Sequence, residues 1–138
     1  MAASVNYVAT GNIRPKRFVM SDPIVAYGVV EATLTTRPIV GISQMGVRGA
    51  PGTTLDTGFA ASSGQQINIF QDEDHDECLL ELGAAVTGGQ LLKADTNALG
   101  VPVVLSGGGS QWAGAEARDS GASGATIRVR PKLIQVYT

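Results

Sequence analysis

The sequence predicts an all-β fold, a small barrel or compact sandwich of two related β-modules with an extended N-terminal arm. Glycine makes up 18 of the 138 residues, well above the ordinary share of about 7%, and it separates short apolar segments. Similar segments recur in the same order in both halves of the chain. No stretch of ten or more residues shows a capped helical period of apolar residues.

The repeat is visible in a few shared landmarks. The motif FVMSD at residues 18–22 is echoed by LLKAD at 91–95, and a glycine follows 19 residues after each aspartate, at Gly41 and Gly114. Each copy ends in a glycine followed by an alternating strand. These landmarks are turn and core residues, which is typical of a duplicated scaffold rather than of an active site.

We expect an arm at residues 1–17, because this segment is small and polar and Pro15 imposes an extended backbone on the residue before it. The single β domain, residues 18–138, then holds repeat 1 at about 18–70, an acidic hairpin at 71–83, repeat 2 at about 91–130 and a final strand at 133–137. Within these parts strands are expected at 18–20, 25–30, 39–42, 67–70, 78–82, 91–93, 101–105 and 127–130.

The first copy carries a long loop at residues 44–63. Gly41 and Gly64 are 23 residues apart, whereas Gly114 and Gly124 are only 10 apart. Loops beyond about 12–15 residues in a compact domain are usually functional or disordered. We therefore predict a second partner contact in this loop, at Val47, Arg48, Leu55 and Phe59.

The charge balance argues against nucleic acid as a partner. The net charge is −2, and five of the twelve acidic residues lie at 72–77, which leaves ten basic and seven acidic residues elsewhere. No run of 18 apolar residues and no apolar leader are visible, so we expect no membrane partner and synthesis in the cytoplasm.

Residue types that could do chemistry are few. Asp72, Asp74 and Asp76 match the start of a calcium loop, but the required later glycine and glutamate are missing. A solvated hairpin tip is the simplest interpretation, with an adventitious divalent site or a basic partner as alternatives. Carboxylates flank His75 and favour its charged form, a poor base, and they disfavour a reactive thiolate at Cys78. We expect no catalytic residue, no metal site, no cofactor and no enzyme activity.

Four motifs, in their order and spacing, resemble the capsid decoration (cement) proteins of tailed bacteriophages. They are NIRPKRFV at 12–19, IVGISQ at 39–44, ECLLELG at 77–83, and LLKAD at 91–95 followed by VP at 101–102. The resemblance implies a β-rich virion protein that binds the exterior of an icosahedral head, often as a homotrimer, and stabilises the shell of the major capsid protein. It supplies no catalytic residue.

In such proteins an extended terminal arm commonly adds a strand to the major capsid protein, which fits a free arm here. The basic arm could equally contact phosphates, or it could be an ordinary solvated segment. On the resemblance we predict that the capsid is bound by Asn12, Ile13, Arg14, Pro15, Lys16, Arg17 and Phe18.

An alternative from another class is a virion fibre or adhesion module that binds host glycans. Such a site needs clustered aromatic side chains, and the available candidates are scattered: Tyr7, Tyr27, Trp112 and Tyr137. A hydrolase or small-molecule barrel lacks a base, a metal set and a cofactor loop in this sequence.

Overall fold

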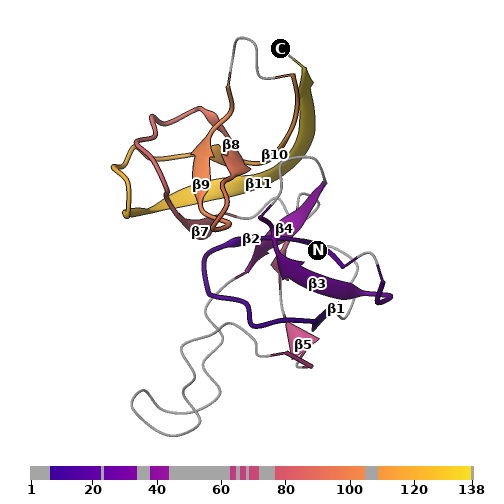
Figure 1. Cartoon of the computed structure of the whole chain (residues 1–138). Helices are drawn as coiled ribbons and strands as arrows, with labels where there is room; N and C mark the ends of the chain where they lie inside the picture. Colours follow the sequence, from indigo (N-terminus) through magenta and orange to yellow (C-terminus); the bar gives the residue numbers. More distant parts are fainter. Residues whose placement is uncertain are drawn as a thin grey trace, which may run out of the picture.

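The computed structural model describes residues 7–22, 24–33, 38–43, 63–64, 66–67, 69–71, 77–104 and 109–137. The regular elements in these ranges are all β-strands, which confirms the predicted class. Figure 1 shows two units stacked on each other, the N-terminal one in indigo and magenta and the C-terminal one in orange and yellow. In these ranges no helix has the length and apolar character needed to cross a membrane.

The N-terminal unit is a sheet that curls round on itself. Its strands are β1 (Tyr7–Ala9), β2 (Phe18–Ser21), β3 (Gly28–Glu31), β4 (Ile39–Ser43), β5 (Gln66–Ile67) and β6 (Ile69–Phe70), in the order β5-β1-β3-β2-β4-β6. β1 runs parallel to β3. β5 and β6 are separated by one residue of sequence yet lie at opposite edges, so the sheet closes into a small barrel.

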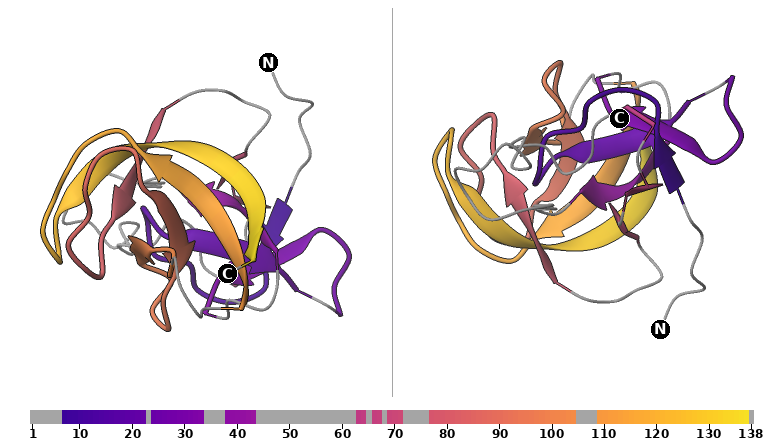
Figure 2. Two further views of the ribbon diagram at one scale, coloured as in Figure 1. Left: turned by 90° about the horizontal axis from the view of Figure 1, so that it is seen from above. Right: turned by 90° about the horizontal axis from the view of Figure 1, so that it is seen from below.

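The C-terminal unit follows the same plan. Its strands are β7 (Cys78–Glu81), β8 (Leu91–Ala94), β9 (Gly100–Pro102), β10 (Ser110–Ala117) and β11 (Thr126–Tyr137), in the order β7-β11-β10-β8-β9. A parallel bridge between Leu82 and Gly100 joins the end of β7 to β9 and closes the ring. Figure 2 shows β11 arching over this unit. In both units the first strand has a parallel contact with the third, β1 with β3 and Leu82 after β7 with β9. The first strand also pairs antiparallel with a late strand of its unit, β1 with β5 and β7 with β11.

Backbone hydrogen bonds repeat between the two units. Those of the first are Asp22 N–H to Gly28 O (2.8 Å), Ser43 N–H to Arg17 O (2.8 Å) and Gly64 N–H to Ala9 O (2.7 Å). Their counterparts are Asp95 N–H to Leu99 O (3.0 Å), Ala117 N–H to Gln90 O (2.9 Å) and Gly124 N–H to Leu82 O (2.8 Å). The prediction of two related β-modules is confirmed.

The structure differs from the prediction of a free arm over residues 7–17. Tyr7–Ala9 is a strand of the first barrel, paired with both β3 and β5. The side chain of Ile13 is fully buried in that barrel. These residues are the first-copy equivalents of β7 and Val86, so the repeat begins earlier than residue 18. Residues 1–6 lie outside the described ranges.

Three strand predictions also need correction. Val25, which we placed in a strand, lies in the turn before β3, because β3 begins only at Gly28. β10 was missed because its sequence, SQWAGAEA, has few β-branched residues. The separate final strand at 133–137 is the end of one continuous strand, β11, which accommodates Pro131 where its register with β10 shifts.

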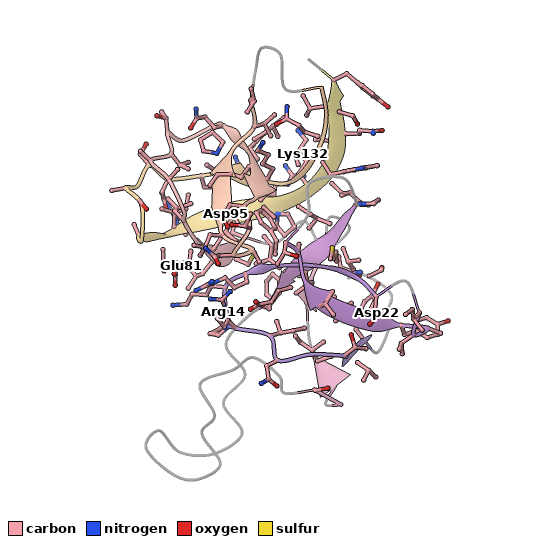
Figure 3. The ribbon with its side chains drawn as sticks, viewed as in Figure 1. Arg14, Asp22, Glu81, Asp95 and Lys132 are labelled. Atoms are coloured by element: carbon pink, nitrogen blue, oxygen red, sulfur yellow. The ribbon has the colours of Figure 1, made fainter. Side chains whose placement is uncertain are left out.

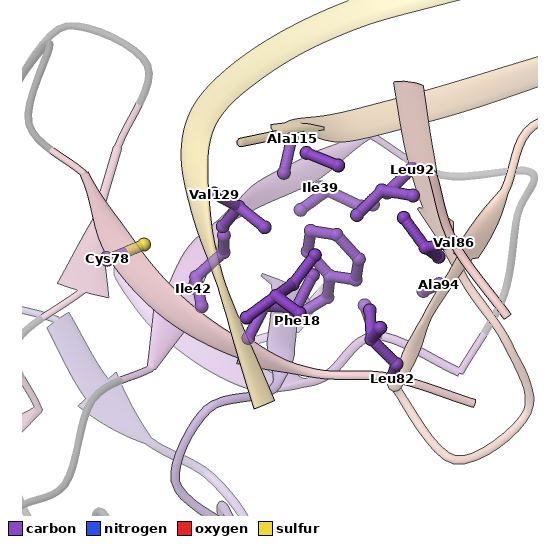
Figure 4. Packing of buried hydrophobic residues seen from close by; sticks show 14 of the residues in the cluster. Phe18, Ile39, Ile42, Cys78, Leu82, Val86, Leu92, Ala94, Ala115 and Val129 are labelled. Atoms are coloured by element: carbon purple, nitrogen blue, oxygen red, sulfur yellow. The ribbon is translucent and has the colours of Figure 1, made fainter. Parts of the chain in front are cut away.

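Adjacent residues of β2 face different interiors. Val19 packs inside the first barrel with Ile13 and Val29. Phe18 and Met20 point the other way, into the larger core that includes the interior of the second barrel. Figure 4 shows the ring of Phe18 surrounded by side chains from both units. The two barrels therefore share one hydrophobic core through β2.

Gly114 lies at this shared core, next to the register shift in β10. A Cβ atom at Gly114 would lie 2.8 Å from Cε1 of Phe18 and 2.9 Å from two side-chain carbons of Ile39. Glycine is thus required here by the close approach of β10 to the first barrel. Gly41, its counterpart in β4, is equally constrained, because a Cβ there would overlap the carbonyl oxygen of Phe70.

We predict that Gly114→Ala lowers the free energy of unfolding by about 1–3 kcal/mol through overpacking. Urea denaturation measures this change. The matched control is Gly11→Ala, because a Cβ at Gly11 meets no atom within 4 Å, and we expect its effect to stay within about 0.5 kcal/mol. Equal stability of the two variants would contradict the packing seen at Gly114.

Candidate functional site

The predicted capsid-binding segment, residues 12–18, lies in the seam between the two barrels. The N–H of Phe18 donates to the carbonyl of Ala98 (3.0 Å), and the N–H of Glu81 donates to the carbonyl of Lys16 (3.0 Å). Phe18 is fully buried. We name this contact, between residues 14–18 of the first unit and β7 with the turn at 95–99 of the second, the seam.

Two arginines fix the seam electrostatically. Nε and Nη2 of Arg14 donate to the two carboxylate oxygens of Glu31 at 2.9 and 3.0 Å. Nη2 of Arg17 donates to Oε2 of Glu81 at 3.1 Å, and both arginines donate to the carbonyl of Asn97 at 3.1 Å. Figure 3 shows Arg14 and Glu81 close together where the units meet. The hydrogen bond to Glu31 raises the pKa of Arg14 above its ordinary value.

Arg17 acts mainly as an internal clamp. Its side chain is 11% exposed, whereas the paired Glu81 is 35% exposed. Nε of Arg17 is buried without a hydrogen-bond partner. If the two units turned away from each other, the buried charge of Arg17 would lose its partner, which is unfavourable. The pair therefore favours one orientation of the two units.

Ser43 at the end of β4 shapes the loop that carries these arginines. Its buried hydroxyl donates to the carbonyl of Arg14 (2.7 Å) and accepts from the N–H of Arg17 (3.2 Å). Between them, Lys16 adopts a left-handed backbone with φ of 59°. The loop is therefore held by the barrel behind it.

The predicted contact residues divide into two groups. Ile13, Arg17 and Phe18 are buried in the molecule. Asn12 is exposed, and Arg14, Pro15 and Lys16 are partly exposed. The predicted second contact loop, with Val47, Arg48, Leu55 and Phe59, lies outside the described residues, as do His75 and the acidic run at 72–76.

An exposed turn at residues 22–28, here named the apolar turn, joins β2 to β3. Exposed fractions there are 90% for Ile24, 67% for Tyr27 and 45% for Val25. The carboxylate of Asp22 accepts from the N–H of Ile24 at 2.8 Å and from the hydroxyl of Thr10 at 2.7 Å, which fixes the base of the turn. Figure 3 labels Asp22 at this end of the first barrel.

Exposed apolar side chains on one tight turn are a common mark of a contact site. The sequence analysis missed this one because it assigned Val25 to a strand. A closer comparison of the copies would have found it, since the second-copy turn at 95–99 is largely polar and the first is largely apolar.

A shallow hollow lies on the second barrel. It is lined by Gly89, Gln90, Leu91, Pro102 and Val103, and its walls are mostly apolar. We name it the apolar hollow. Gly89 and Gln90 come from the loop before β8, Leu91 begins β8, and Pro102 and Val103 lie at and just after the end of β9.

The end of β11, paired with the start of β10, forms a third exposed region. Apolar side chains there remain accessible at Leu133, Ile134 and Tyr137, with exposed fractions of 39%, 39% and 74%. This ribbon continues beyond the length of the corresponding first-copy strands.

The basic residues of β11 are balanced by carboxylates on neighbouring strands and turns. Arg128 lies 2.9 Å from Asp119, and Lys132 lies 3.7 Å from Glu116. Such exposed pairs contribute little to stability, because water and salt screen them.

Cys78 is the one chemical candidate of the sequence analysis that lies within the described ranges. Cys78 is buried in the shared core. No group of three histidine, cysteine or acidic side chains that could hold a metal occurs in the described ranges.

The pair of Asp119 and Arg128 gives a pH-dependent prediction. The Arg128 side chain, followed by its backbone N–H, lowers the pKa of Asp119 by hydrogen bonding to the carboxylate. The pair therefore stabilises the folded state fully at pH values above the unfolded-state pKa of Asp119. This stabilisation is lost as pH falls through the lower folded-state pKa.

In an NMR titration we expect Arg128→Ala to raise the pKa of Asp119. The control Arg118→Ala, which pairs with Glu77 and Glu116 instead, should leave it unchanged. An unchanged midpoint in Arg128→Ala would contradict the pairing.

Comparison with known proteins bears on the fold. No protein-family model matches the sequence, and no curated protein matches it. The crystal structure of the N base of the head fiber protein gp8.5 of bacteriophage phi29 is similar, with a TM-score of 0.58 and 13% sequence identity. The alignment covers 96% of this chain and 95% of that one. The likeness therefore extends over both barrels, and the two-barrel architecture is a fold that this chain shares with the base of a phage head fiber.

Proposed function

We propose that this chain is a structural protein of a bacteriophage virion, which binds the outer surface of an icosahedral head and stabilises the shell of the major capsid protein. The observation that carries the proposal is the likeness to a head fiber base over almost the full length of both chains. The sequence motifs that resemble decoration proteins support the same role. In this role the protein acts by binding and needs neither a cofactor nor catalysis.

We place the head contact at the exposed part of the segment originally predicted. Asn12, Pro15 and Lys16 lie at the surface beside the seam, and the guanidinium of Arg14 is partly exposed. Arg14 is already paired with Glu31, so the charge of Lys16 is the feature that suits an acidic surface on the major capsid protein. The protein would act as a homotrimer, and many copies on one shell would add weak contacts into strong overall binding.

A sedimentation experiment tests the proposal. Purified protein is mixed with undecorated expanded heads and centrifuged, and we expect it to pellet with the heads until the sites are filled. Protein that stays in the supernatant would refute head binding. Deletion of residues 1–17 is not a useful variant, because it would remove β1 and the buried Ile13.

We predict that Lys16→Glu weakens head binding about two- to fivefold, the effect of losing one exposed ion pair. The loss should shrink as salt is added, because salt screens exposed charges. The control is Lys132→Glu, an equal charge reversal on β11 of the other barrel, which should bind like the natural protein. If the two variants bind alike, the head contact lies elsewhere.

A fibre or adhesion role is the second candidate, and it is favoured because the structural neighbour is the base of a head fiber. The exposed tyrosines Tyr27 and Tyr137 are the side chains that would stack on sugars. Strong signals on a glycan array, lost on changing either tyrosine to alanine, would support this role over head stabilisation.

A further inference from the structure

The seam shows how one copy of the repeat can bind the other. The turn at 95–99 of the second copy presents two carbonyls, Asn97 and Ala98, to the loop at 14–18 of the first. Ala98 becomes fully buried in this contact. A turn of one repeat therefore docks on the loop before the second strand of the other repeat.

Each element of this contact has a counterpart that faces outward. The loop at 14–18 corresponds to residues 87–91, since Lys16 and Gly89 both have a left-handed backbone two residues before a strand. The turn at 95–99 corresponds to the apolar turn, since Ala98 and Tyr27 share the same left-handed backbone. The two outward elements lie on different barrels, so they belong to different surfaces of the molecule.

The outward elements complement each other chemically. Ile24, Val25 and Tyr27 project from the apolar turn with little cover. The apolar hollow, built on the loop at 87–91, offers Leu91, Pro102 and Val103 as its walls. Burial of large apolar side chains in such a recess is the main source of binding energy at protein interfaces.

A contact between the two outward elements cannot reproduce every hydrogen bond of the seam. The carbonyl of Tyr27 already accepts from the N–H of Val8 (3.0 Å), whereas the carbonyl of Ala98 accepts from the other repeat. The backbone bond of the seam is therefore replaced by side-chain contacts, which agrees with the apolar character of the first-copy turn.

We propose that the apolar turn of one molecule docks into the apolar hollow of a second copy of this chain. The two surfaces differ, so the contact is head-to-tail, and it closes into a ring when the rotation between copies permits. A ring of three copies would provide the trimer of the proposed function. The contact itself does not depend on head binding and is tested on the isolated protein.

The test uses native mass spectrometry and sedimentation equilibrium on two variants, one for each surface. Ile24→Asp places a charge on the turn, and Pro102→Asp places one in the hollow. We expect the natural protein to be oligomeric and each variant to be monomeric, with the dissociation constant raised at least about tenfold. Tyr137→Asp, an equal charge on an exposed aromatic outside both surfaces, should keep the natural oligomer.

Mixing the two variants distinguishes a head-to-tail contact from a symmetric one. Each variant retains one intact surface, so the mixture should form a one-to-one heterodimer and nothing larger. A monomeric natural protein, an oligomer that survives Ile24→Asp, or a mixture without heterodimer would overturn the proposal. If Pro102→Asp fails to fold, Ile24→Asp and Tyr27→Asp decide the question, because both side chains are mostly exposed and their loss does not disturb the core.

Discussion

The burial of Phe18 between the two barrels is the constraint on which the rest of the structure depends. Its backbone pairs with β4 of the first barrel, its N–H bonds the second barrel, and its ring fills the core of the second. A side chain of this size contributes several kcal/mol on burial. The first barrel has a small interior of its own, but the core of the second is incomplete without Phe18, so the seam arginines act on a junction that is already packed.

The sequence predicted those parts of the fold that depend on local pattern. The repeat, the turn aspartates Asp22 and Asp95 and the constrained glycines Gly41 and Gly114 are all landmarks that short motifs reveal. β1 escaped prediction because it is three residues long and pairs in parallel with β3, a contact that leaves no periodic signal. Its second-copy equivalent, β7, was predicted as a strand at 78–82, because its apolar residues alternate over four positions.

The candidate site was harder to predict because its meaning depends on distant partners. In the sequence Arg14 and Arg17 have no acidic residue nearby and look like free cations. In the fold they pair with Glu31 of β3 and Glu81 of β7, which lie further along the chain. The apolar turn was misjudged in the opposite direction, because residues that we expected in a strand are exposed. Its residues looked like part of a strand, and only their exposure in the fold distinguishes a contact surface from a core segment.

The closure of each barrel has a consequence for how the chain folds. In the first barrel Tyr7 must meet Ile67, a pairing between residues far apart in sequence. Bringing such segments together costs chain entropy before the contacts repay it, so proteins of this topology fold slowly. The same closure leaves few strand edges from which unfolding can start. A newly made chain should therefore acquire its binding surfaces late, after both rings have closed, and should then hold them for long periods.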